Sequence, residues 1–200
     1  MRYYIVCFLC LLVPVMVSAQ LGIGLKAGLN FANVTNTAGF KNSSRTGYMI
    51  GGYISPKAKK ILGFRSELIL SRQGYDYKTN TNTGNVNLDY LLLPQLIILR
   101  FTKKFQLHLG GQAAFLLNAK VDSTNGNNSG SLFNYFNRFD YGVVGGAEVS
   151  PISGLFIGAR INVSFNSVNK EAPIGGNWPS FIPRLDAKNN VVQLYAGWRF

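Results

Sequence analysis

Apolar and polar residues alternate along much of this chain with a period of two. In residues 105–117 the odd positions are Phe, Leu, Gly or Ala, whereas the even positions are mostly polar or small. Successive side chains of a strand point to opposite faces, so this period predicts a strand with one apolar face. A helix would repeat its apolar positions every three or four residues instead.

The same alternation recurs in seven further segments: residues 21–30, 46–55, 62–72, 86–101, 139–150, 155–166 and 192–200. Segment 86–101 is the least regular, because leucine and isoleucine occupy both faces and Pro94 lies in its middle. A transmembrane helix is the competing interpretation, but the run is short and proline breaks helices. We expect a strand, with Pro94 at a bulge or a register shift.

The connections between these segments alternate in length. Residues 31–45, 73–85, 118–136 and 167–189 form long connections, whereas 56–60, 102–104 and 151–154 form short ones. Transmembrane barrels have short periplasmic turns and longer extracellular loops. A sheet that spans lipid must also close on itself, because lipid offers no hydrogen bonds to the backbone. The sequence therefore predicts an all-β, closed antiparallel transmembrane β-barrel of eight strands, with both termini in the periplasm.

The first residues have the features of a secretory signal peptide. Arg2 precedes an apolar run over residues 5–17, and Ala19 ends a small-residue cleavage site. We expect a signal peptide at 1–19 and a barrel domain at 20–200. An uncleaved anchor is the alternative, although the apolar run is short for a span of about 20 residues. Cys7 and Cys10 both lie in this segment, so the mature chain would hold no cysteine for a disulfide or thiolate site.

Polar side chains on the second face of the strands are expected inside the barrel. Eight strands leave an interior that side chains just fill, and buried charges need partners. We expect a network in which Glu148 lies near Arg160, and Glu67 lies near Arg65 or Lys26. The inward polar set comprises Lys26, Arg65, Glu67, His108, Gln112, Asp140, Glu148, Arg160, Gln193 and Arg199.

Aromatic residues gather toward the ends of the expected strands, as in the interfacial girdles of membrane barrels. The alternative is the general enrichment of aromatic residues in strands. The residues concerned are Phe31, Tyr48, Phe64, Tyr75, Phe101, Phe105, Phe139, Tyr141, Phe165, Trp198 and Phe200.

Two resemblances point to the bacterial outer membrane. The alternating residues Leu194, Ala196, Trp198 and Phe200 resemble the C-terminal signal that the barrel-assembly machinery recognises in outer-membrane proteins. The layout as a whole resembles the porT-like outer-membrane β-barrel family of Bacteroidota. Its carrying motifs are residues 21–30, Glu67 with 71–74, and the segments 90–94, 110–114 and 145–148. The resemblance implies a barrel fold in the outer membrane; the founding member's link to secretion is not assigned to this chain.

Catalytic, metal and cofactor chemistry find little support in the sequence. His108 is the one histidine, and its same-face neighbours Gln106 and Gly110 offer no nucleophile for a lipid-modifying enzyme. We expect it to be a packed lumen residue. Asp122, with the Asn- and Ser-rich residues 123–131, supplies too few carboxylates for a calcium site. We therefore expect no enzyme activity, no metal and no cofactor.

Charge and loop composition raise the question of partners. The chain has 20 Lys and Arg against 8 Asp and Glu, giving a formal charge of +12. Cations in the long loops suggest contact with lipopolysaccharide phosphates; a solvated loop surface is the alternative. In loop 167–189, Trp178 and Phe181 would either dock a protein partner or pack on the barrel rim. No basic face with stacking aromatics suggests nucleic acid.

We therefore expect an integral outer-membrane barrel with a side-chain-filled lumen and a structural or loop-mediated interaction role. The alternative is a transport- or secretion-associated barrel, either a narrow channel or an accessory protein. A lipid-modifying enzyme is the remote alternative. The expected partners are outer-membrane lipid, lipopolysaccharide, the barrel-assembly machinery and an unknown protein that binds the loops.

Overall fold

The computed structural model describes residues 21–34, 41–56, 61–78, 83–123, 130–131, 133–170 and 188–200. The expected signal peptide and the loop residues Trp178 and Phe181 lie outside these described residues. Within the described part of the chain, no helix has both the length and the apolar character needed to cross a membrane.

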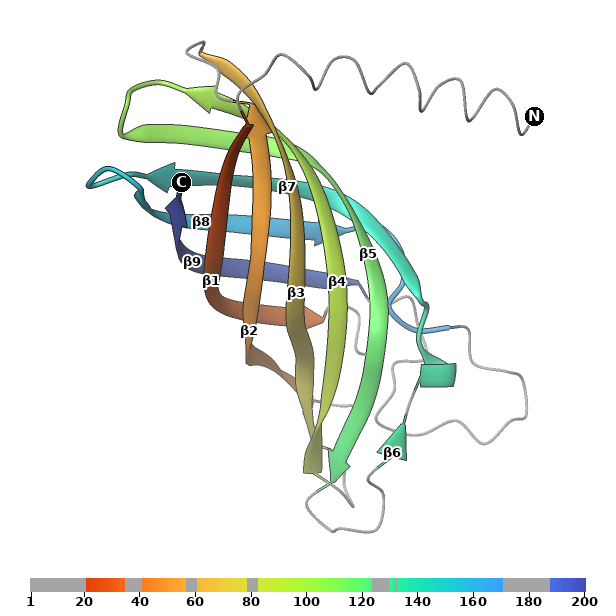
Figure 1. Cartoon of the computed structure of the whole chain (residues 1–200). Helices are drawn as coiled ribbons and strands as arrows, with labels where there is room; N and C mark the ends of the chain where they lie inside the picture. The colour runs from red at the N-terminus through yellow and green to blue at the C-terminus, as the bar shows by residue number, and fades with distance from the viewer. Residues whose placement is uncertain are drawn as a thin grey trace, which may run out of the picture.

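Almost all of the described chain is strand (Figure 1). A short 3-10 helix, η2, spans Phe133–Tyr135. The strands are β1 (Leu21–Val34), β2 (Lys41–Pro56), β3 (Leu62–Lys78), β4 (Thr83–Arg100), β5 (Phe105–Ser123), β6 (Gly130–Ser131), β7 (Phe139–Val149), β8 (Leu155–Ser164) and β9 (Asn189–Arg199).

Eight of these strands form a closed antiparallel ring. Their order around the ring is β1, β2, β3, β4, β5, β7, β8, β9, and each pairs with its neighbours. The ring closes between β1 and β9, where Lys26 is opposite Gly197. The two-residue strand β6 pairs only with β5. The predicted eight-stranded barrel is therefore confirmed.

The strands differ in length, so the two ends of the barrel differ. Strands β2 to β5 have 16 to 19 residues, whereas β7 to β9 have 10 or 11. Figure 1 shows β3, β4 and β5 continuing beyond the rest of the ring. We call this the extended end, and we call the opposite end the turn end, where residues 101–104 and 150–154 join strands.

The structure corrects three sequence expectations. Residues 31–45, 73–85 and 118–136 were expected to be loops, but residues 31–34, 41–45, 73–78, 83–85 and 118–123 lie in strands. The alternation in much of these segments is reversed: Tyr75, Tyr77 and Val121 face inward, while Asp76, Asn85 and Asp122 lie on the outer face. Tyr75 is 0% exposed, so it belongs to the lumen and not to an aromatic girdle.

Pro94 does not mark a register shift. Ser66 is opposite Gln95 and Ile69 is opposite Leu92, so the register of β3 and β4 is the same on both sides of the proline. The ladder is only interrupted there, because proline has no backbone N–H. The register shift that β4 does have precedes Pro94 in the chain. It lies between Asp89 and Tyr90 in the pairing of β4 with β5, where β5 has one extra residue.

The outer surface of the ring is a belt of exposed apolar side chains. Leu109 is 64% exposed and Leu25 is 57% exposed, although both lie in the middle of long strands. Toward the extended end, aromatic rings contact one another in a row. The ring centres of Phe115 and Phe139 are 5.3 Å apart, and those of Tyr141 and Phe165 are 6.0 Å apart. Large apolar residues with this exposure suit lipid, and an aromatic row at the belt's edge suits its interface with water.

Candidate functional site in the barrel lumen

Five charged side chains meet inside the turn-end half of the barrel. Each is at most 2% exposed, because each occupies an inward position of its strand. We call them the ionic layer: Lys26, Arg65, Glu67, Glu148 and Arg160. Three cations face two carboxylates, so every anion of the layer has a cation to bind.

The two carboxylates connect distant strands. Glu67 Oε2 lies 2.6 Å from Lys26 Nζ and 2.6 Å from Arg160 Nη1. Arg65 Nη1 lies 2.6 Å from Glu148 Oε1 and 3.7 Å from Glu67 Oε1. Strands β3 and β8 lie on opposite walls of the ring, so the Glu67–Arg160 pair crosses the lumen.

The expected pairing of Glu148 with Arg160 is wrong. Their strands are neighbours, and Arg160 lies opposite Gly146, two residues from Glu148. However, the Arg160 side chain reaches across to Glu67, and Glu148 binds Arg65. In an eight-stranded ring the interior is narrow enough for a long side chain to reach the opposite wall. The expected contact of Glu67 with Lys26 is present.

Neutral polar groups complete the layer. Arg160 Nε donates to Gln193 Oε1 over 2.5 Å, and Gln193 donates in turn to Asn30 Oδ1 over 2.6 Å. Glu148 accepts hydrogen bonds from Gln106 Nε2 and, over 2.9 Å, from the Tyr195 hydroxyl. A buried ion pair is more stable when its remaining polar atoms are also bonded. These neighbours bond Arg160 Nε and Glu148, whereas Arg65 Nε, Glu67 Oε1 and Arg160 Nη2 are buried without a hydrogen-bond partner among the described residues.

Two cations of the ionic layer also lie over the faces of aromatic rings. Lys26 Nζ lies 4.5 Å from the centre of the Tyr195 ring, and the Arg65 guanidinium lies 4.2 Å from that of Tyr53. Such contacts stabilise a cation that is removed from water. The ionic layer is therefore bounded by aromatic side chains as well as by amides.

The other residues of the inward set lie around this layer or away from it. His108 is 2% exposed, with Nε2 3.4 Å from the Tyr195 hydroxyl. Arg199 Nε donates to the Tyr53 hydroxyl over 3.2 Å. Asp140 accepts from the backbone N–H of Tyr141 over 2.7 Å, apart from the layer. Gln112 has a buried Oε1 that finds no hydrogen-bond partner among the described residues.

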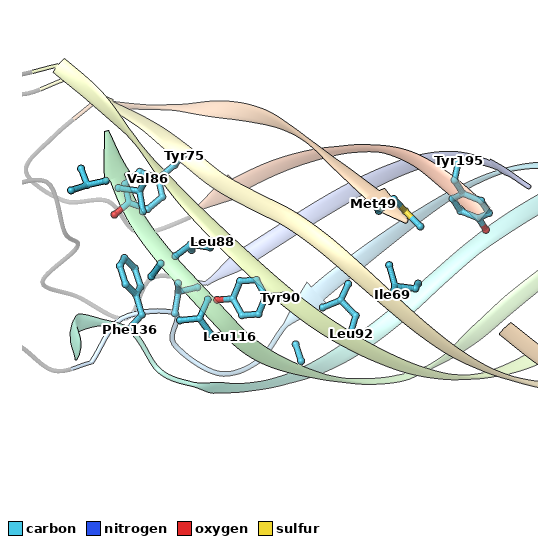
Figure 2. Close-up of a cluster of buried hydrophobic side chains, with 14 of the residues drawn as sticks. Met49, Ile69, Tyr75, Val86, Leu88, Tyr90, Leu92, Leu116, Phe136 and Tyr195 are labelled. Carbon is cyan, nitrogen blue, oxygen red and sulfur yellow. The ribbon is translucent and has the colours of Figure 1, made fainter. Parts of the chain in front are cut away.

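The sequence analysis missed a second group of lumen residues at the extended end. Figure 2 shows Tyr75, Val86, Leu88, Tyr90 and Leu116 grouped around Phe136. The available signal was the reversed alternation in residues 73–88, which places apolar residues inside a sheet with a polar outer face. We call this group the outer cluster: Tyr75, Tyr77, Val86, Leu88, Tyr90, Leu116, Ala119, Val121, Phe136 and Val168.

Two segments outside the long strands close over the outer cluster. Asn137 N–H donates to the Val168 carbonyl and Lys170 N–H donates to the Tyr135 carbonyl, each over 2.9 Å. An isolated bridge joins Phe136 to Asn169. These bonds hold Phe136, which is 0% exposed, against the inner face of β3 to β5.

The outer face of the extended end carries paired charges. Arg72 forms two hydrogen bonds to Asp89, of 2.6 and 3.0 Å, and Arg45 Nη1 lies 2.5 Å from Asp76. Asn118 also donates to Asp89 over 3.2 Å. This face therefore has the polar, ion-paired character of a sheet in contact with water.

In the described part of the chain, no group of His, Cys, Asp or Glu side chains is placed to hold a metal ion. The lumen holds ion pairs and amides together with buried aromatic and aliphatic side chains.

A closed eight-stranded ring with an apolar belt outside and an interior filled by the ionic layer and the outer cluster defines a small transmembrane β-barrel protein of the bacterial outer membrane. Residues 18–170 match the sequence model of a family described as "Outer membrane protein beta-barrel domain". This chain belongs to that family.

Solved structures of small outer-membrane proteins share the fold. Ail, the attachment invasion locus protein of Yersinia pestis, aligns over 90% of this chain and 98% of its own with a TM-score of 0.51 and 16% identity. Neisserial surface protein A aligns over 90% and 97% with a TM-score of 0.53 and 11% identity. OprG from Pseudomonas aeruginosa aligns over 91% and 97% with a TM-score of 0.51 and 12% identity. No curated protein sequence gives a significant match.

Proposed function

We propose that this chain is a plugged outer-membrane barrel that strengthens the envelope or presents its extended end to a partner, without catalytic turnover. The observation that carries the proposal is the ionic layer, in which Glu67 on one wall binds Arg160 on the opposite wall. A solute passing through the lumen would have to separate these charges, and separating a buried pair is costly. The outer cluster fills the lumen further along.

We further propose that the turn end faces the periplasm, together with both chain termini. Short connections at 101–104 and 150–154 support this orientation, because short turns face the periplasm in outer-membrane barrels. The extended end would then project from the cell. Its polar outer face, with the Arg72–Asp89 and Arg45–Asp76 pairs, suits exposure to water.

The projecting end gives the proposed partner surface. Lys78 and Lys120 are exposed there, and exposed cations suit the phosphates of lipopolysaccharide. The structure of Ail in complex with the heparin analogue sucrose octasulfate supplies a precedent for a polyanion bound by a barrel of this fold. Membership of the porT-like branch, suggested by the glycine spacing, is part of the same proposal.

Conductance in planar bilayers tests whether the ionic layer closes the lumen. The purified protein should show no steady single-channel steps, whereas Glu67→Ala with Glu148→Ala should admit small ions by removing both anions of the layer. The matched control is Arg72→Ala, which removes an ion pair from the outer face and should stay silent. Steady unit steps from the unsubstituted protein would overturn the plugged barrel.

One observation favours the second candidate, a narrow channel. His108 Nδ1, Gln112 Oε1 and both side-chain polar atoms of Asn162 are buried and have no hydrogen-bond partner within the described part of the chain. Buried polar atoms of this kind are usually satisfied by water, so a file of waters would occupy this part of the lumen. Small, steady currents in the same bilayers would favour the channel. The ring nitrogen of His108 faces the Tyr195 hydroxyl, so this contact adds no support for a lipid-modifying enzyme with a serine nucleophile.

A further inference from the structure

The lipid-facing belt has a polar interruption at its middle. On β3 the outward residues are leucine or phenylalanine except for Ser66, and on β4 they are leucine or isoleucine except for Gln95, along the part of each strand that lies in the belt. On β5 the central outward residue is Gly111. Gln95 is opposite Ser66 on one side and Gly111 on the other, so the three form one patch across adjacent strands.

The patch contains an incompletely bonded amide. Gln95 is exposed, and its Nε2 donates to Ser66 Oγ over 2.8 Å. Its Oε1 accepts no hydrogen bond from the described residues, and its second amide hydrogen is likewise free within them. Acyl chains have no group to bond to this amide, and polar groups at the middle of a membrane are costly unless they find a partner.

Gly111 is not explained by the packing of its own chain. A Cβ at this position would meet only the Gly142 carbonyl oxygen, at 3.9 Å, and the backbone does not require glycine there. The contrast is Gly110, where a Cβ would collide with the Gln95 backbone oxygen in the lumen. The missing side chain of Gly111 therefore leaves open space on the lipid side, opposite Gln95 on the neighbouring strand.

We propose that a second copy of this chain docks on the outer face of β3, β4 and β5, with the two Gln95 amides bonded to each other across a twofold axis. A primary amide has both a donor and an acceptor, so two copies related by a twofold axis satisfy each other with two reciprocal bonds. Ser66 keeps a hydroxyl proton to donate.

The surroundings of Gln95 suit a close approach of two barrels. Gly111 leaves room for the partner's surface, and apolar side chains flank the amide above and below, with Leu68 55%, Ile97 52% and Leu109 64% exposed. A copy of the same patch supplies both the polar group at the matching depth and the apolar surface around it. A different protein would have to present an amide or hydroxyl at this same depth.

Cross-linking in outer membranes tests the docking face. Gln95→Cys places a thiol on the proposed axis, and Ala196→Cys places one on the outer face of β9, which is opposite β4 in the ring. The unsubstituted chain controls for Cys7 and Cys10. Oxidation should give a species of twice the chain mass for Gln95→Cys alone. No dimer, equal dimer from both variants, or an adduct of another mass at position 95 would each overturn the proposal.

Two substitutions separate docking from folding. Gln95→Leu should weaken association in bilayers at least tenfold, as measured by energy transfer between labelled copies. Gly111→Leu should do the same by filling the space opposite Gln95, while a heat-modifiable band on gels shows that the barrel still forms. Folded variants that associate as strongly as the unsubstituted chain would show that this face does not bind a second copy.

Discussion

The two halves of the lumen are filled by different chemistry. The ionic layer brings together charged side chains from β1, β3, β7 and β8, including strands on opposite walls. The outer cluster is built mainly from the adjacent strands β3, β4 and β5, with Phe136 and Val168 packed on top. One half is therefore held by contacts across the ring, and the other by contacts along one wall.

This difference predicts different responses to damage. Removing one carboxylate of the ionic layer leaves buried cations without a partner, and the penalty of an uncompensated buried charge is large. Removing one apolar side chain of the outer cluster leaves a cavity, whose cost depends on how far its neighbours relax. Removing a carboxylate of the ionic layer should therefore lower the free energy of unfolding more than truncating an apolar side chain of the outer cluster.

The largest effect is expected for Glu67→Ala. This substitution removes the partner of both Lys26 and Arg160, and breaking a buried pair costs about 3–5 kcal/mol. Glu148→Ala, which strands Arg65, should fall in the same range. Urea unfolding of the refolded barrel in detergent measures both free energies of unfolding. An unchanged midpoint would mean that the layer's cations find other partners.

The next effect is expected for Leu88→Ala in the outer cluster. Leu88 is 0% exposed, and truncating a buried leucine costs about 3 kcal/mol through lost burial and the cavity left behind. The volume-conserving control Leu88→Met should cost less than about 1.5 kcal/mol. Equal losses for the two substitutions in urea unfolding would contradict tight packing at this end.

The independence of the two halves is tested by combining Glu67→Ala with Leu88→Ala. Leu88 is opposite Gln73, six residues along β3 from Glu67, which is about 20 Å at the rise of a strand. Changes at this separation should add, with a coupling below about 0.5 kcal/mol. A larger coupling in the double-mutant cycle would show that the halves act as one unit.

The smallest effect is expected for Arg72→Ala. Its ion pair with Asp89 is well formed, but the Arg72 side chain is 40% exposed and the Asp89 side chain is 24% exposed. Ion pairs in contact with water contribute less than about 1 kcal/mol and weaken with salt. A loss comparable to that of Glu67→Ala in the same unfolding experiment would remove the distinction between lumen and surface charges.

Much of the fold could be predicted because the alternation of residues depends only on strand geometry and lipid. The segment 105–117 has its apolar residues on the outer face, and the structure places it in the ring as β5. Residues 73–78 and 118–123 were missed as strand because their pattern is reversed: Tyr75, Tyr77 and Val121 face inward, and polar residues such as Asp76 and Asp122 face outward. A search for apolar outer faces takes such a segment for a loop.

The lumen residues were predictable, but their partners were not. Period two places Glu67, Glu148 and Arg160 on the inner face, since neighbouring side chains alternate between faces. It does not say which long side chain reaches which wall. The pair expected between neighbouring strands, Glu148–Arg160, is replaced by contacts of Glu148 with Arg65 and of Arg160 with Glu67. Gln95 was also readable, as the one amide among the outward residues of an apolar run.

The pairing across the ring also has a consequence for the order of folding. Glu67 and Arg160 are 93 residues apart in sequence, and Arg65 and Glu148 are 83 apart. Contacts between such distant residues form only after most of the loss of chain entropy has occurred. We expect the ionic layer to assemble late, so that Glu67→Ala speeds unfolding and leaves the folding rate almost unchanged, with a φ-value near zero. Stopped-flow measurement of the folding and unfolding rates checks this expectation. If only the unfolding rate changes, the paired charges slow the opening of a barrel that has already closed.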